Sequence, residues 1–340
     1  MKKFTFFISF LLFCSLFVFS AETAKPKEGE GIYKFLRSNG RDPVAHYDAF
    51  IELNKNKLGK NLSLLKGVSY TLPPVATKTT AVTKATTATT PKVAKKNTAI
   101  ESLFGKNYDE YTIRSNKLAG ATFYLVSGHG GPDCGAIGYV DGIAIHEKEY
   151  AYDITLRLAR HLMMEGATVY MIIQDKQDGI RDERILKNTR RETCRGKEIP
   201  TSQVKRLQQQ CDEINTLAGN SKANYKRAVF IHLDSRSKHK QLDVFFYYNQ
   251  TSAAGKQLAN TMRATFKEQY HKHQPNRGFS GTVSPRNLYV LENTTTPSLF
   301  AELGNIQNSH DQKRFLVNTQ RDALAKWMCL GLITDYEKSR

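Results

Sequence analysis

The stretch TFYLVSGHGGPDCGAIGYVDGIAIHEKEYAYD, residues 122–153, decides the fold of the larger part of this chain. Residues 123–126 are apolar, aromatic or β-branched and stop at the glycines around His129, which is typical of a buried strand with a histidine at its carboxyl end. From Glu147 onward, small or apolar residues recur at helical spacing as far as Gly166, which predicts a helix that begins with a glutamate. A strand-end histidine and a helix-start glutamate make half of a metal site.

Two later segments have the same form, a buried strand that ends in a residue able to bind metal or transfer protons. Residues 227–231 lead to His232, and residues 298–303 contain Glu302 just before a glycine. In open α/β sheets, ligands gather at the carboxyl ends of the strands, so these side chains are expected to converge with His129. Two histidines and a carboxylate with an open fourth position are typical ligands of a catalytic zinc ion, and a further carboxylate can transfer protons.

Residues 121–336 alternate between strand-like and helix-like segments. Strands are expected at 123–126, 168–173, 228–231, 243–248, 288–291 and 299–303, and helices from 147, from 253 and through 327. This alternation predicts an α/β fold with a mixed, mostly parallel sheet covered by helices. Residues 182–224 are a long polar connection between two strands. We expect them to bind substrate or gate the site, with a solvated surface excursion as the alternative.

The first 21 residues have the layout of a cleavable secretory signal, because Lys2 and Lys3 precede a Phe/Leu-rich run that ends in small residues. The run is short for a membrane span, so export without a stable membrane anchor is expected. A net charge of +18 would suggest nucleic acid as a partner, but export argues against it. The remaining explanations of the charge are binding to anionic wall polymers, binding to membrane surfaces, or a solvated surface. Export also permits disulfides, and Cys194–Cys211 is the expected pair.

Composition divides the exported chain into three parts. Residues 28–73 combine two helix-like segments with an alternating final strand, and the stretches GEGIYKFLRSNG and LLKGVSYTLP with Leu53-Asn54 resemble a LysM module, a small glycan-binding α/β fold. An unrelated small α/β module is the alternative. Residues 74–97 contain almost only Thr, Ala, Val, Lys and Pro, which predicts a flexible linker. Residues 98–340 are the expected catalytic domain.

Four motifs carry a second resemblance, namely GHGG at 128–131, HEK at 146–148, IHLDS at 231–235 and AELGN at 301–305. In this order they resemble the zinc-dependent N-acetylmuramoyl-L-alanine amidases of the cell-wall type. The resemblance implies Zn²⁺ as cofactor, with ligands His129, Glu147 and His232 and the catalytic carboxylate Glu302. Candidate substrate contacts are Arg236, Arg277 and Asn305. The chain departs from the usual pattern at Val126-Ser127, Leu233 and Asn305, which leaves the ligands intact and affects their surroundings.

The resemblance implies an exported bacterial peptidoglycan hydrolase, periplasmic, extracellular or associated with the cell wall. It would cleave the amide bond between N-acetylmuramic acid and L-alanine with zinc-activated water. Its partners would be glycan strands and stem peptides, and a protein activator is left open. The alternatives are a non-catalytic wall-binding or division scaffold, and a zinc peptidase or esterase that acts on another wall bond.

Overall fold

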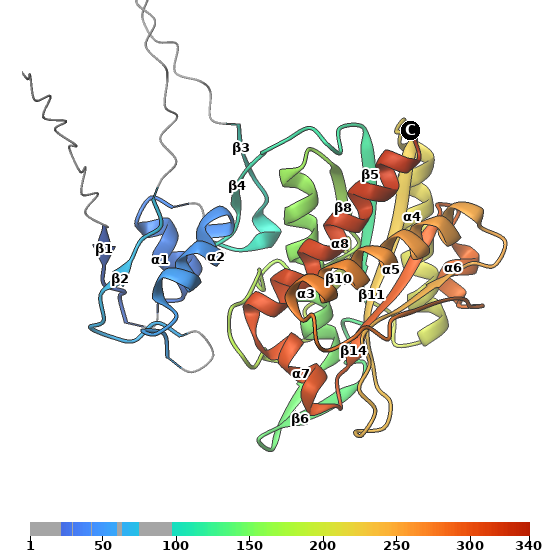
Figure 1. Ribbon diagram of the computed structural model, residues 1–340. Helices are drawn as coiled ribbons and strands as arrows, with labels where there is room; N and C mark the ends of the chain where they lie inside the picture. Colours follow the sequence, from blue (N-terminus) through green and yellow to red (C-terminus); the bar gives the residue numbers. More distant parts are fainter. Residues whose placement is uncertain (1–21, 29, 42, 60–62, 75–96) are drawn as a thin grey trace, which may run out of the picture. The chain divides into compact units, whose positions relative to one another are not determined.

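A computed structural model describes residues 22–28, 30–41, 43–59, 63–74 and 97–340 (Figure 1). The expected signal peptide, residues 1–21, lies outside these residues, as does all but the first and last residue of the expected linker. The chain divides into two compact units, Met1–Thr90 and Pro91–Arg340. Within the described ranges, no helix is both long enough and apolar enough to cross a membrane.

The first unit contains two helices and a two-stranded antiparallel sheet. Its elements are β1 (Thr23–Ala24), α1 (Ile32–Ser38), α2 (Pro43–Asn54) and β2 (Tyr70–Thr71). Phe35, Phe50 and Tyr70 are fully buried, and their ring centroids lie 5.7–6.0 Å apart. These three rings form the centre of a small core, because α1, α2 and β2 each contribute one of them.

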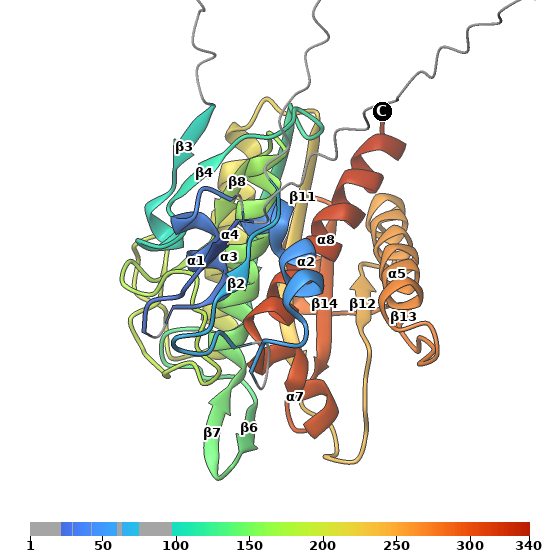
Figure 2. The same ribbon diagram turned by 60° about the vertical axis from the view of Figure 1, so that its left-hand side comes forward.

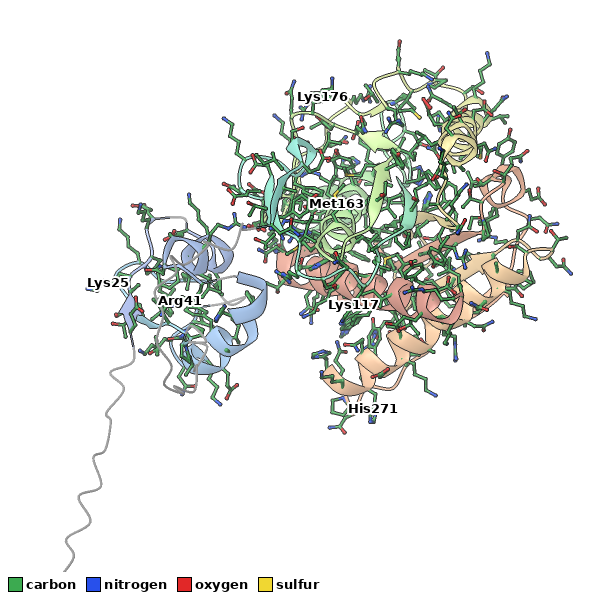
Figure 3. All side chains as sticks on the ribbon, turned by 90° about the horizontal axis from the view of Figure 1, so that it is seen from above. Lys25, Arg41, Lys117, Met163, Lys176 and His271 are labelled. Carbon is green, nitrogen blue, oxygen red and sulfur yellow. The ribbon has the colours of Figure 1, made fainter. Side chains whose placement is uncertain are left out.

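Two buried polar side chains connect separate segments of this unit through hydrogen bonds. The Asn54 side-chain amide donates to the carbonyls of Phe50 and Thr71, which ties the end of α2 to β2. Arg41, labelled in Figure 3, donates to the Pro73 carbonyl at 3.0 Å and to the Glu22 carboxylate at 2.6 Å. The first strand and Glu22 therefore belong to the unit, although both precede residue 28, where the sequence placed its start.

The second unit is built around one six-stranded sheet. Its strands are β5 (Ala121–Ser127), β8 (Thr168–Met171), β11 (Tyr225–Asp234), β12 (Phe245–Tyr248), β13 (Thr282–Pro285) and β14 (Ser298–Asn305). Their order is β13-β12-β14-β11-β5-β8, and every neighbouring pair is parallel except β12 and β14. The predicted mixed, mostly parallel sheet is confirmed, with β13 as a strand that the sequence did not indicate.

Helices cover both faces of this sheet. Their bounds are α3 (Glu147–Met164), α4 (Gln203–Asn220), α5 (Ala253–His273), α6 (Tyr289–Asn293), α7 (Ser309–Leu316) and α8 (Asn318–Lys338). Helix α8 packs against α3 and α5, and Figure 2 shows α5 beside α8. Residues of α4 share an apolar cluster with Tyr124 and Val126 of β5. Phe123 and Leu125, on the opposite face of β5, are fully buried as well, so neither face is open there.

Short antiparallel pairs complete the unit. They are β3 (Thr98–Ile100) with β4 (Glu110–Thr112), β9 (Ile173–Gln174) with β10 (Thr193–Cys194), and β6 (Ile137–Val140) with β7 (Ile143–His146); a 3-10 helix, η2, spans Ser102–Phe104. The β6–β7 hairpin projects near α7 in Figures 1 and 2. Gln312 of α7 donates to the Tyr139 carbonyl at 3.1 Å. The hairpin is thus held where it leads into α3.

Two predictions about residues 182–291 were wrong. Residues 288–291 do not form a strand: Leu288 is the N-cap of α6 and residues 289–291 lie in that helix, because a short apolar run fits a buried helix turn as well as a buried strand. The polar connection 182–224 contains the whole of α4, a helix that the sequence did not indicate, and its expected role in binding or gating stays a prediction. Cys194 and Cys211 are free thiols inside the same apolar cluster, and burial raises the pKa of Cys194 to about 12.

A buried ionic network joins α3 to α8. Asp153 is fully buried and accepts hydrogen bonds from Arg157 at 2.8 Å, from Arg321 at 2.6 Å and from the Arg181 backbone N–H at 2.7 Å. Arg321 is itself fully buried. Such a network is costly to break, because each partner that is removed leaves a charge without a counter-ion in the interior.

Candidate metal centre and active site

Three side chains from strand and helix ends meet at the carboxyl edge of the sheet. His129 follows β5, Glu147 is the first residue of α3, and His232 lies near the end of β11. Strands β5 and β11 are parallel neighbours, with Ser127 opposite Ile231, so the residues that come next on each strand emerge at the same edge. The convergence predicted from the sequence is present.

The Glu147 carboxylate lies between the two imidazole rings. Its Oε2 atom is 3.0 Å from Nε2 of His129, and its Oε1 atom is 3.0 Å from Nδ1 of His232. The two ring centroids are 5.0 Å apart. One ligand atom from each of the three residues lies within 4.8 Å of the other two, which is close enough for one ion to contact all three.

Two glycines make this close approach possible. A Cβ atom on Gly128 would lie 2.4 Å from the His232 ring. A Cβ atom on Gly135 would lie 2.6 Å from Cδ2 of His129 and 2.8 Å from Oε2 of Glu147, and Gly135 has a φ of +67°. The glycine-rich sequence around His129 therefore leaves room for the cluster and does more than form a turn.

Burial and mutual charge perturb the pKa values of the cluster. Burial alone would lower the pKa of His129, but the carboxylates of Glu147 and Asp133 outweigh it and raise the pKa to about 10. Burial would raise the pKa of Glu147, yet the two histidines hold it well below its ordinary value. For His232, burial dominates and lowers the pKa. The carboxylate is thus ionised and in need of positive charge.

The donor set fits a zinc ion. Within the described residues, the ion-pair partners of the buried Glu147 carboxylate are the two imidazoles, so its charge is balanced only if a ring carries a proton. A metal cation balances the same carboxylate with both rings neutral, which is the form in which histidine binds metal. Two histidines and one carboxylate are the protein ligands of several catalytic zinc sites.

Asp133 orients His129 from the side away from Glu147. Its Oδ2 atom is 2.9 Å from Nδ1 of His129, and its Oδ1 atom accepts the Gly135 backbone N–H at 3.1 Å. Arg206, on α4, donates to the same Oδ2 atom at 2.7 Å. With Nδ1 engaged by a carboxylate, Nε2 is the nitrogen that faces Glu147 and is left to bind metal.

A second contact joins the GHGG loop to the connection that precedes α4. The Glu192 carboxylate accepts the Gly131 backbone N–H at 3.0 Å, and the buried Lys148 ammonium lies 3.1 Å from the Glu192 Oε1 atom. Sequence reasoning missed Asp133, Glu192 and Arg206. Asp133 could have been found from its position four residues after His129. Glu192 and Arg206 carry no local signal, since their partners lie 61 and 73 residues away.

Glu302 lies beside the cluster on β14, where it is the register partner of His232. Its Oε2 atom is buried and has no hydrogen-bond partner among the described residues. Burial, followed by the negative charges of Glu147 and Asp234, raises the pKa of Glu302 well above its ordinary value. A carboxyl group with a raised pKa next to a metal-binding cluster is suited to taking up and releasing a proton.

The three candidate substrate contacts lie in different surroundings. Arg277 forms an ion pair with Asp243 at 2.5 Å. Asn305 is fully buried and donates to two backbone carbonyls of the loop after β11. Arg236 is 39% exposed and lies over the ring of Phe245, the register partner of Glu302. Arg236 therefore lies over the strand next to Glu302, while Arg277 and Asn305 form contacts within the fold.

The family model described as N-acetylmuramoyl-L-alanine amidase matches residues 124–334, more than half of the chain. The chain belongs to this amidase family. The predicted family and enzyme class, a peptidoglycan amidase, are thereby confirmed. The matched residues include every member of the cluster and Glu302.

Relatives of known structure and sequence are distant. The germination-specific N-acetylmuramoyl-L-alanine amidase of Bacillus subtilis (strain 168) is 23% identical over 229 residues, which make up 67% of this chain and 84% of that protein. The CwlD amidase from Clostridioides difficile, solved in complex with the GerS lipoprotein, is 22% identical with a TM-score of 0.48, over 64% of this chain and 98% of that one. Ami1 from Mycobacterium smegmatis is 18% identical with a TM-score of 0.48, over 65% and 99% of the two chains.

Proposed function

We propose that this amidase hydrolyses the amide bond between N-acetylmuramic acid and L-alanine of peptidoglycan, with zinc held by His129, Glu147 and His232. The observation that carries the proposal is the buried carboxylate bracketed by two imidazoles at 3.0 Å each. A second carboxyl group, that of the half-buried Glu302, lies next to it, and its buried Oε2 atom has no hydrogen-bond partner among the described residues. Together they supply a ligand set and a separate group for proton transfer.

In such a site zinc acts as a Lewis acid that lowers the pKa of water and polarises the amide carbonyl. Glu302 takes the proton of the attacking water at its carboxylate and returns it to the amide nitrogen as the carbon–nitrogen bond breaks. The products are a lactyl carboxylate and a free alanine amine. Asp133 keeps the His129 ring in one orientation throughout, and Phe300 does the same for His232 by stacking on its ring at 4.3 Å.

The described part of the first unit, from Glu22 to Pro74, is proposed to be a LysM-like module that binds glycan. The support is its two helices on a two-stranded sheet, together with the motifs GEGIYKFLRSNG and LLKGVSYTLP. We also propose that residues 1–21 direct export to the periplasm or the cell wall. There the net charge of +18 favours contact with anionic polymers.

The proposal is tested by replacing Glu302 with glutamine, which keeps the shape of the side chain and removes its ability to carry the proton. We expect hydrolysis of a soluble muramyl peptide to fall by about 10²–10⁴-fold, while zinc stays at about one ion per chain. Glu292→Gln, at an exposed position on α6, is the matched control and is expected to match the wild type. Wild-type turnover in Glu302→Gln would refute the assignment, and loss of zinc would make Glu302 a ligand.

A further inference from the structure

A strip of aromatic side chains extends from the metal cluster across β14 and β12. Phe300 pairs with Tyr247 in the antiparallel register, and Phe245 pairs with Glu302, so all four side chains lie on one face of the sheet. The Phe300 ring stacks on His232 at 4.3 Å, Tyr247 lies 6.3 Å from Phe300, and Phe245 lies 6.1 Å from Tyr247. The strip therefore begins at a proposed zinc ligand and leads away from it.

Two guanidinium groups lie over this strip. The Cζ atom of Arg236 is 4.6 Å from the centre of the Phe245 ring, and that of Arg286 is 4.9 Å from the centre of the Tyr247 ring. The two residues come from separate segments, one after β11 and the other after β13. The aromatic rings therefore form one layer and the two guanidinium groups a second layer over it. Both lie where β12 begins, next to Glu302 of β14.

Arg236 and Arg286 differ in whether they already form an ion pair. Arg236 donates to the Asp234 carboxylate at 2.7 Å, so its charge already has a counter-ion. Arg286 is exposed and forms no ion pair with any residue in the described part of the chain. Arg286 lies over Tyr247, which is the register partner of Phe300, and the Phe300 ring stacks on His232. Arg286 is thus a cation near the reaction centre whose hydrogen-bond donors remain available.

The guanidinium group of Arg286 and the aromatic strip together indicate the kind of ligand that this surface binds. A guanidinium group presents a planar set of donors that matches a carboxylate with two parallel hydrogen bonds. Stacking on Tyr247 restricts the Arg286 side chain, so less conformational entropy is lost when a ligand binds. The partly exposed rings of Phe245 and Phe300 offer apolar area to the methyl and methylene groups of a peptide. An acidic peptide, with its carboxylate on Arg286 and its aliphatic part on the rings, fits both.

We propose that Arg286 and the aromatic strip form a subsite for the stem peptide of the substrate, and that Arg286 binds a carboxylate of that peptide beyond the alanine. This inference rests on the proposed function, because the peptide is placed by its scissile amide at the cluster. Arg286 is a specificity-determining residue and takes no part in bond cleavage. The amidase accordingly prefers acidic stem peptides to those in which the same carboxylate is amidated.

The test uses two soluble muramyl peptides that differ only in whether the amino acid after alanine carries a free carboxylate or a carboxamide. For the wild-type full chain we expect KM to be on the order of tenfold lower for the acidic peptide, the factor expected for one charge-assisted hydrogen bond. In Arg286→Gln this preference should fall to about one, mainly through KM, with kcat changed by less than about twofold.

Two further variants separate binding from structure. Arg286→Lys keeps the charge without the planar donor set, and should retain part of the preference. Arg340→Gln is the matched control, because Arg340 also lies over a tyrosine ring, Tyr336, at 5.4 Å, and Tyr336 contacts Ala119 ahead of β5, at the opposite edge of the sheet. Arg340→Gln should behave as the wild type.

Equal KM values for the two peptides in the wild-type protein would overturn the inference, as would an undiminished preference in Arg286→Gln. If the wild type cleaves neither peptide, the proposed function fails instead. Calorimetric binding of the two uncleaved peptides then decides the inference. Tighter binding of the acidic peptide that is lost in Arg286→Gln supports it, and equal binding contradicts it.

Discussion

Replacing Asp133 with asparagine removes the carboxylate that orients His129. In the wild type, Oδ2 of Asp133 accepts from Nδ1 of His129 at 2.9 Å and from Arg206 at 2.7 Å, while Oδ1 accepts from Gly135 at 3.1 Å. An asparagine that keeps its oxygen toward Gly135 must place its NH₂ group where two donors already point. The imidazole then has to move its proton to Nε2, the nitrogen that faces the metal site.

The size of the effect follows from these contacts. Loss of such an outer partner typically weakens metal binding by about 10–100-fold, or about 1.4–2.7 kcal/mol. The fold should lose less, about 1 kcal/mol, because Arg206 keeps its hydrogen bonds to the Pro200 and Thr201 carbonyls. We therefore expect Asp133→Asn to lose more free energy of zinc binding than free energy of unfolding.

The assay is competition between the metal-free protein and a chromophoric chelator for zinc, at fixed pH. Asp141→Asn is the matched control. Asp141 also pairs with an arginine, Arg184, but that pair is exposed, at 74% and 46%, and the φ of +52° at Asp141 is one that asparagine adopts readily. Asp141→Asn should bind zinc as the wild type does. An unchanged zinc Kd in Asp133→Asn would refute the orienting role of Asp133.

The other predictions concern the stability of the second unit, its zinc binding, and the role of the first unit in binding cell walls. Asp153→Asn should lower the free energy of unfolding by about 3–5 kcal/mol in a urea titration, because the buried Arg321 has no other ion-pair partner among the described residues. Burial would raise the pKa of Asp153, but Arg157 and Arg321 outweigh it and lower the pKa, so this contribution should be complete above about pH 4 and vanish as the pH falls through the lowered value. An acid titration of the wild type that matches that of Asp153→Asn would contradict this. Gly135→Ala should weaken zinc binding at least tenfold by chelator competition, because its Cβ atom would press on His129 and Glu147. Removal of residues 28–73 should weaken binding to intact cell walls and spare cleavage of a soluble muramyl peptide; equal loss on both substrates would contradict a tethered binding module.

The parts of the fold that sequence reasoning predicted are those with a local signal. Strands β5 and β14 are continuous apolar runs because both of their faces are buried, and glycines mark where each run ends. Helix α3 shows its apolar spacing directly. His129 follows β5, Glu147 begins α3 and Glu302 lies near the end of β14, so the candidate site followed from the same signals.

The parts that were missed depend on contacts between distant segments. Helix α4 has its apolar residues at 207, 211, 214 and 218, a helical spacing that was obscured by the many polar residues between them. The run 288–291 became part of a helix because it packs in that same cluster. The Arg206–Asp133 pair joins positions 73 residues apart, and no local pattern in a single sequence specifies such a pairing.

The central claim is that zinc at His129, Glu147 and His232 supports cleavage of one particular amide bond. The direct measurement is end-group analysis of purified peptidoglycan after digestion by the full chain, with a zinc-stripped sample and Glu302→Gln alongside. We expect new amino-terminal alanine and no new reducing sugar ends in the zinc-loaded wild type, with neither product above background in the other two samples. New reducing ends, new amino termini on another residue, or full activity without zinc would contradict the claim.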